Sequence, residues 1–133
     1  SFPTRRSSDL LLPEAITYVG AIKKAGSGSG HPLLAHAYTR YLGDLSGGQI
    51  IKKILARSLA LPPEALSFYE FPEIADIRRF KDAYRDVLEL AGAAMADPGA
   101  VVEEAATAFK LNITLSEALQ ECFHGLTGHM INF

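Results

Sequence analysis

The feature that most constrains this chain is a long helical pattern over residues 33–59 with three glycines near its middle. The glycines fall in YLGDLSGGQ (41–49), and Pro62 and Pro63 end the pattern downstream. Each glycine costs a helix roughly 0.5–1 kcal/mol relative to alanine. A helical face made of glycine has no side-chain wall. Another surface can therefore come close to the backbone of this helix.

Helical periodicity covers most of the remaining chain, with apolar residues recurring three or four positions apart. Helices are predicted over 13–24, 33–59, 74–95 and 100–123, with a loop or short turn over 62–72 and a flexible linker over 25–30. The last two helices carry apolar stripes that are candidates for burial: Ile77, Phe80, Tyr84, Val87, Leu88 and Ala91, then Val101, Ala105, Ala108, Phe109, Leu111, Leu115 and Leu119. Asp97 and Pro98 are a typical N-cap and first residue of the last helix. No segment alternates as a strand does, so the sequence predicts an all-α fold.

Composition narrows the class of protein. The 133 residues suggest one domain, and 48% hydrophobic with 21% charged residues is a globular composition. A net charge of −2 offers no basic field for nucleic acid or an anionic membrane. No apolar run reaches the roughly 20 residues of a membrane span. The single cysteine, Cys122, allows no internal disulfide and fits a reducing compartment.

The glycine-containing helix also carries the polar residues with most chemical potential. On a helical wheel His36, Arg40, Gly43 and Gly47 fall on one face, and Asp44 lies at its edge. Close packing against another helix is one explanation of the small residues. The other is a planar ligand pressed against the backbone, with Asp44 organising water and delivering protons. The pattern alone leaves both open.

Three further groups of residues have a structural and a functional reading. Lys81 and Arg85 lie four residues apart, either as a solvated basic pair or as a clamp for carboxylates at a pocket rim. Phe109 and Asn112 lie three apart, and Phe109 by itself reads as core. Near the C-terminus, Cys122, His124 and His129 match no standard zinc spacing, so no metal site is predicted.

Three segments together resemble one family. LLAHAYTRYLGDLSGGQIIKKI (33–54) resembles the signature of the heme oxygenases almost letter for letter. FPEIADIRRFKDAYR (71–85) and EEAATAFKLNITLSEALQE (103–121) resemble two further segments of that family. The likeness covers about residues 11–122, and a motif as long as the first is highly specific.

The resemblance implies a fold and an activity. The implied fold is all-α, with heme held between a proximal helix and a kinked distal helix, and residues 41–49 would lie on the distal helix. The implied reaction cleaves heme to biliverdin, carbon monoxide and ferrous iron, using O2 and electrons from a reductase. The implied location is the cytoplasm or the cytoplasmic face of a membrane.

The resemblance also implies roles for individual residues. Gly43 and Gly47 would let the backbone lie on the heme face, and Gly48 would give flexibility at the kink. Asp44 would hold the distal water network that supplies protons, and Arg40 would join that network. The remaining implied contacts with heme are Tyr38, Lys81 and Arg85 at the propionates, and Phe109 and Asn112 along the pocket.

The chain departs from the family pattern in several places. No histidine matches the axial ligand of the iron, the upstream propionate-binding lysine has no counterpart, and Ser116 stands where the family has phenylalanine. Residues 1–10, SFPTRRSSDL, resemble a translated sequencing adapter. The sequence therefore predicts an artefactual leader (1–10), a partial, distal heme oxygenase domain (11–123) that is inactive alone, and a frayed tail (124–133). The alternative is a non-catalytic heme-binding or helical interaction module.

Overall fold

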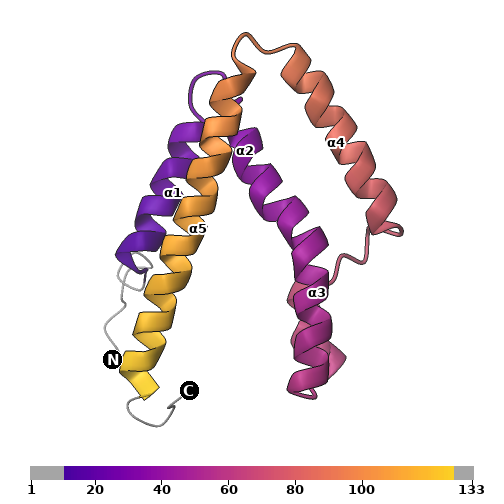
Figure 1. Cartoon of the computed structure of the whole chain (residues 1–133), viewed down its shortest axis with the longest axis vertical. Coiled ribbons are helices and arrows are strands. Elements are labelled where there is room, and N and C mark those ends of the chain that lie inside the picture. The colour runs from indigo at the N-terminus through magenta and orange to yellow at the C-terminus, as the bar shows by residue number, and fades with distance from the viewer. Residues whose placement is uncertain (1–10, 128–133) are drawn as a thin grey trace, which may run out of the picture.

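The computed structural model describes residues 11–127, and these residues are helical with no strand (Figure 1). The elements in chain order are α1 (Pro13–Ala25), α2 (Leu33–Ala37), the π-helical turn η2 (Tyr38–Leu42), α3 (Gly43–Ser58), the 3₁₀ helix η3 (Pro63–Tyr69), α4 (Ile77–Ala93) and α5 (Pro98–Thr127). The predicted all-α class is confirmed. The predicted leader, residues 1–10, lies outside the described residues.

Aspartate side chains cap the starts of the last two helices. Helix α4 begins after Asp76, whose carboxylate accepts a hydrogen bond from the Arg79 backbone N–H at 3.0 Å, so it starts later than the predicted residue 74. Asp97 caps α5 as predicted and accepts from the Ala100 N–H at 3.2 Å. Helix α5 continues to Thr127, so residues 124–127 of the predicted frayed tail are helical, and the rest of that tail is not described.

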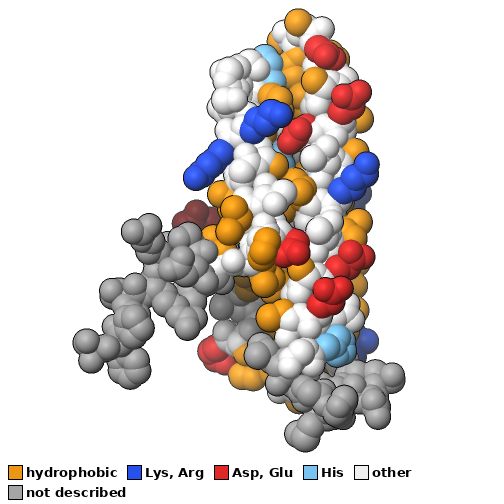
Figure 2. All heavy atoms as spheres, turned by 90° about the vertical axis from the view of Figure 1, so that its left-hand side faces the viewer, with side chains coloured by type: hydrophobic (Ala, Val, Ile, Leu, Met, Phe, Trp, Pro, Cys, Tyr) orange, Lys and Arg blue, Asp and Glu red, His pale blue; other side chains and the backbone are white. Residues whose placement is uncertain are grey.

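The helices form two arms that diverge from one end of the molecule (Figure 1). One arm is the antiparallel pair α1 and α5, against which α2 and η2 pack. The other arm is α3 with η3 packed along it, and α4 runs back toward the start of α5. Seen from the α1 and α5 side, acidic and basic side chains are interspersed with hydrophobic ones, so that face has no field of a single sign (Figure 2).

The core of the described part is small and combines alanines with leucines and one tyrosine. Its buried hydrophobic residues in the described part are Tyr18, Ala25, Ala35, Leu42, Leu45, Leu66 and Ala108. The predicted burial of the apolar stripes is wrong at several positions, because no described element covers them. No residue of α4 is buried, Val87 is 65% exposed, and Phe109 and Leu119 on α5 are 52% and 54% exposed.

The long helical pattern is continuous from Leu33 to Ser58, but its geometry changes inside it. The irregular turn is η2, which ends at Leu42, immediately before the first glycine. Single π-helical turns inside α-helices are uncommon and occur frequently at functional sites. The wider turn rotates α3 relative to α2, which decides where the polar residues of the two segments point.

Candidate functional site

Two of the three glycines lie on an open face of α3. A Cβ atom placed at Gly43 or at Gly47 would have no atom of the described residues within 4 Å beyond its local backbone. Both residues are exposed, and they lie four positions apart on one side of the helix. The backbone here is accessible to a flat partner, and the described part of the chain does not fill that face.

Gly48 has a different environment. It is buried, and a Cβ atom there would lie 3.5 Å from Cδ1 of Tyr69 and 3.7 Å from Cβ of Asp44. Close packing, the first of the two explanations for the glycines, therefore applies at Gly48, where η3 rests against α3. The predicted role of Gly48 as a flexible point in a kink stays a prediction.

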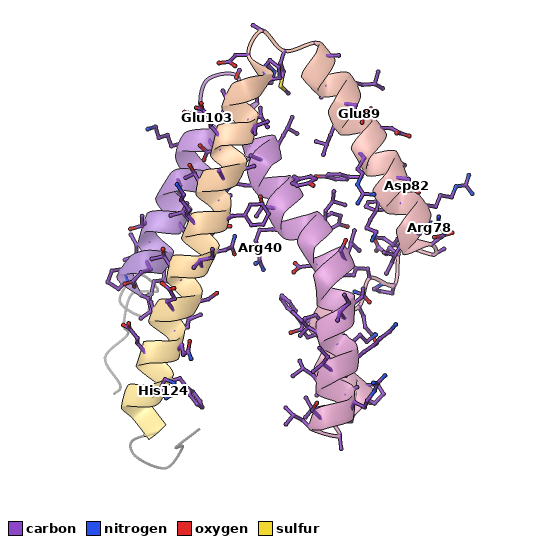
Figure 3. The ribbon with its side chains drawn as sticks, viewed as in Figure 1. Arg40, Arg78, Asp82, Glu89, Glu103 and His124 are labelled. Carbon is purple, nitrogen blue, oxygen red and sulfur yellow. The ribbon has the colours of Figure 1, made fainter. Side chains whose placement is uncertain are left out.

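A chain of hydrogen bonds leads to the edge of the open face from three different elements. The Tyr18 hydroxyl on α1 accepts from Nδ2 of Asn112 on α5 at 2.7 Å. Oδ1 of the same amide accepts from Nη1 of Arg40 on η2 at 3.0 Å. The other guanidinium nitrogen of Arg40 lies 3.9 Å from the Asp44 carboxylate on α3. The side chain of Arg40 lies in the space between α5 and α3 (Figure 3).

The amide orientation of Asn112 is set by its surroundings. Its Nδ2 also donates to the Ala108 carbonyl at 3.0 Å, so both amide hydrogens have acceptors while Oδ1 faces the cation. Arg40 and Asp44 are both partly exposed, and a pair of that kind contributes little stability by itself. The arrangement instead holds a guanidinium and a carboxylate together beside an accessible backbone.

Sequence reasoning missed Tyr18. Its ring is 7% exposed, its hydroxyl bonds Asn112, and its ring meets the ring of His36 edge-on with centroids 6.0 Å apart. The available signal was a tyrosine within the amphipathic pattern of the first helix, since a buried tyrosine needs a partner for its hydroxyl. Nothing in the spacing pointed to a partner 94 residues away.

His36 is buried, whereas Arg40, Gly43 and Gly47, predicted to share a face with it, are exposed. The His36 side chain is 4% exposed and its Nε2 lies 2.7 Å from Oε1 of Glu104 on α5. The helical wheel assumed α-helical geometry throughout, whereas η2 separates His36 from the glycines. His36 and Arg40 both bond side chains of α5, whereas a Cβ atom at Gly43 or Gly47 would meet no atom of another described element within 4 Å.

The two cations of the predicted clamp are not brought together. Nζ of Lys81 donates to Oγ of Ser46 on α3 at 3.2 Å, which places the amine beside the glycine-containing helix. Arg85 pairs within α4, where Nη1 donates to Asp82 at 3.3 Å. The clamp stays a prediction, and in this structure only Lys81 is directed at α3.

The remaining predicted residues lie around the same region. Tyr38 is partly exposed and lines an apolar cavity of about 360 Å³ formed by α2, α4 and α5. Phe109 is exposed on α5, one turn before Asn112. The exposed part of each side chain is available to a ligand.

An aromatic cluster connects η2 to α4. Tyr41 packs against Phe71, Phe80 and Tyr84, with ring centroids 5.9, 5.9 and 6.2 Å apart. Burial raises the pKa of the Tyr84 hydroxyl above its ordinary value, and the neighbouring Tyr41 raises that pKa further. Through Tyr41 the cluster attaches η2 to α4, while Arg40 of the same turn bonds α5.

The described residues contain neither a membrane-spanning helix nor a cluster of metal ligands. None of the helices there is long and apolar enough to cross a membrane. No group of three or more histidine, cysteine or acidic side chains gathers within residues 11–127 in an arrangement that could hold a metal ion.

Comparison with known proteins identifies the family. The heme oxygenase family profile matches residues 4–118, which is most of the chain. The chain belongs to the heme oxygenase family.

Individual relatives agree in sequence and in fold. The chain is 48% identical to human heme oxygenase 1 over 111 residues, and 43% identical to the heme oxygenase of Guillardia theta over 115 residues. Among solved structures it matches heme oxygenase-1 of Synechocystis in complex with heme with a TM-score of 0.80 at 35% identity, covering 90% of this chain. It matches the Leptospira interrogans heme oxygenase with a TM-score of 0.74 at 40% identity, covering 86% of this chain.

The chain spans only part of each relative. It covers 38% of the human protein and 48% of the Guillardia protein. It covers 54% and 57% of the Synechocystis and Leptospira chains.

Proposed function

We propose that these residues form the distal part of a heme oxygenase, which cleaves heme oxidatively to biliverdin, carbon monoxide and ferrous iron. The observation that carries the proposal is the open backbone at Gly43 and Gly47 beside the Asp44 carboxylate. A flat macrocycle can approach such a surface closely, and an adjacent acid can manage protons for chemistry on it. The solved Synechocystis relative is described as a complex with heme.

The polar chain has a defined task in this proposal. Heme, as the substrate, supplies the iron at which O2 reacts. Asp44 organises water at the glycine face and passes protons to it. Arg40 lies beside the carboxylate, 3.9 Å away, and helps to hold it in place. Asn112 and Tyr18 keep Arg40 from turning away.

The cationic and aromatic residues recognise the edge of the substrate. The Lys81 ammonium, already directed at α3 by Ser46, can bind a heme propionate there, and Tyr38 can donate a hydrogen bond to one. Arg85 joins them only by releasing Asp82, which is an exposed and weak partner. Phe109 supplies an exposed ring for contact with the porphyrin.

We further propose that the chain needs additional protein to form a working site. The chain spans 38% to 57% of the relatives described above. Large apolar side chains stand exposed on α3, α4 and α5, among them Ile54, Leu90 and Ile113. His36, the histidine nearest the glycines, is engaged with Glu104. The complete enzyme, meaning these residues together with the remaining part of the domain, would supply the axial histidine and cover these faces.

The complete enzyme also needs electrons and O2. We propose that a separate reductase donates the electrons, as the resemblance to the heme oxygenases implies. We place the protein in the cytoplasm or on the cytoplasmic face of a membrane, in keeping with its single cysteine.

Titration of the 133-residue chain with hemin tests the need for additional protein. We expect neither tight one-to-one binding nor biliverdin formation when a reductase and O2 are supplied. A tight complex with the absorption spectrum of a histidine-ligated heme would contradict this part of the proposal.

Substitution of Asp44 in the complete enzyme tests the activity itself. Asp44→Ala is expected to retain heme while losing biliverdin formation by roughly 10²–10⁴-fold, the usual range for a proton-transfer group. Asp86→Ala removes another exposed aspartate, on α4, and is the matched control. Full biliverdin formation by Asp44→Ala would overturn the role of the acid. Heme binding without turnover by the unaltered protein would favour a non-catalytic binding module.

A further inference from the structure

A second polar contact crosses the same interface as the Arg40–Asn112 bond and has no part in the reaction proposed above. His36 and Glu104 meet at 2.7 Å between α2 and α5, and the histidine ring is almost completely buried. Burying polar groups is costly unless they are paired. The pairing with Glu104 offsets the cost of burying His36, and it also fixes the position of one helix relative to the other.

The two contacts are arranged as successive rungs between the same pair of segments. Arg40 follows His36 by four residues, and Asn112 follows Glu104 by eight residues along α5. One rung lies just before η2 and the other within it. A hydrogen bond depends steeply on distance and angle, so the His36–Glu104 rung restricts sliding and rotation of α2 against α5.

Tyr18 joins the two rungs physically. Its ring lies edge-on to the ring of His36, and its hydroxyl accepts from the Asn112 amide at 2.7 Å. A displacement of His36 therefore reaches Asn112 by two routes: through the backbone of η2 and through the Tyr18 ring.

The unpartnered atom of His36 indicates which tautomer is present. Within the described residues, Nδ1 is buried and has no hydrogen-bond partner. A hydrogen on Nδ1 would be a buried donor without an acceptor, whereas a hydrogen on Nε2 is accepted by the Glu104 carboxylate. The geometry favours the tautomer that carries its hydrogen on Nε2.

We infer that His36 and Glu104 are positioning residues, which fix η2 against α5 and so place Arg40 and Asn112 for their work at Asp44. The inference rests on the proposed function for its catalytic consequence. The inference also has a structural consequence: the geometry of the Asn112 amide depends on Glu104, two helical turns away. This consequence does not depend on the proposed function.

Nuclear magnetic resonance of the Asn112 side-chain amide in the 133-residue chain tests the structural consequence. Glu104→Leu removes the acceptor and is expected to shift the Asn112 amide signals. Glu104→Gln keeps an acceptor for the Nε2 hydrogen and is expected to leave them near their original positions. Glu103→Leu alters the neighbouring, exposed glutamate of the same helix (Figure 3) and is the matched control. Unchanged Asn112 signals in folded Glu104→Leu would overturn the inference.

A milder substitution covers the case in which Glu104→Leu does not fold. Glu104→Asp keeps the charge but shortens the side chain by one methylene, so the 2.7 Å contact cannot form without movement. Glu104→Asp is expected to shift the same Asn112 amide signals. Unchanged signals in this variant would overturn the inference, as they would in Glu104→Leu.

Kinetics of the complete enzyme test the catalytic consequence. They also test the inference by themselves if the resonances of the isolated chain cannot be assigned. Glu104→Asp is expected to lower kcat for biliverdin formation roughly tenfold to a hundredfold, the scale of a small misplacement, with little change in the dissociation constant for heme. Glu104→Gln should restore kcat. Equal loss of heme affinity, or no loss of kcat, would contradict positioning. Absence of turnover in the unaltered enzyme would instead count against the proposed function and leave the amide measurement intact.

Discussion

At the scale of single residues, the site depends on partners that are far apart in the sequence. Asn112 is the clearest case, because it bonds Tyr18, Arg40 and the Ala108 carbonyl at once. A single amide with four hydrogen-bonding positions uses three of them here to join α1, η2 and α5. Its apolar replacement would leave the Tyr18 hydroxyl, in a residue that is 7% exposed, without this partner, which typically costs more than the bond itself contributes.

Tyr84 provides a residue-scale prediction about alkaline pH. Its pKa in the folded chain is raised above the unfolded value of about 10, first by burial and then by the neighbouring Tyr41. The folded state then binds the proton more tightly. The protonated Tyr84 hydroxyl therefore contributes its full share of stability below about pH 10, and this share is lost as the pH rises through the raised pKa. Tyr84→Phe cannot ionise and is expected to lose less stability between about pH 8 and about pH 11.

The measurement for Tyr84 is the urea midpoint of unfolding across this pH range. Tyr41→Phe is an informative companion, because removing the second cause should reduce the alkaline loss only in part. Parallel pH profiles for the original chain and Tyr84→Phe would show that this hydroxyl does not control alkaline stability.

At the scale of single elements, the glycines of α3 separate local helix stability from function. Gly43 and Gly47 weaken a helix whose described surroundings have room for a side chain. Gly48 is constrained by Tyr69 on η3. The two explanations considered for a glycine-rich helix therefore apply to different residues of the same helix.

Gly47→Ala is expected to stabilise the chain while harming the site. The added methyl group meets nothing in the described structure, so unfolding should become costlier by about 0.5–1 kcal/mol. The same methyl group would separate a flat substrate from the backbone, so heme affinity or turnover of the complete enzyme should fall.

Gly20→Ala on α1 is the matched control, because a Cβ atom there also meets nothing within 4 Å. It should raise stability by a similar amount without affecting heme. Unaltered heme binding and turnover in Gly47→Ala would show that the open face is not where the substrate lies.

At the scale of the whole molecule, the two arms are held together at one end and diverge toward the other (Figure 1). Helix α4 has no buried residue, and its contacts include Phe80 and Tyr84 against Tyr41 and Lys81 against Ser46. By contrast, Ala108 in the middle of α5 is 0% exposed. Elements with few buried contacts open most easily.

Hydrogen exchange should reflect this difference. In the isolated chain the backbone amides of α4 are expected to exchange faster than those of α5 near Ala108. Tyr41→Ala should accelerate exchange in α4 further while leaving α1 and central α5 unchanged, since the cluster is a main attachment of α4. Protection of α4 equal to that of central α5 would contradict this description of the fold.

The sequence by itself determined the all-α class, the caps at Asp97 and Pro98, and the family, because helical periodicity, capping chemistry and a long motif are local properties of the chain. It also placed Asp44, Arg40 and the glycines on one continuous helical path. Only the tertiary structure decided that His36 turns to Glu104, that Gly48 packs against Tyr69, and that Tyr18 completes the chain to Arg40. These outcomes depend on a π-helical turn and on contacts as distant as 94 residues, and local periodicity carries no information about either.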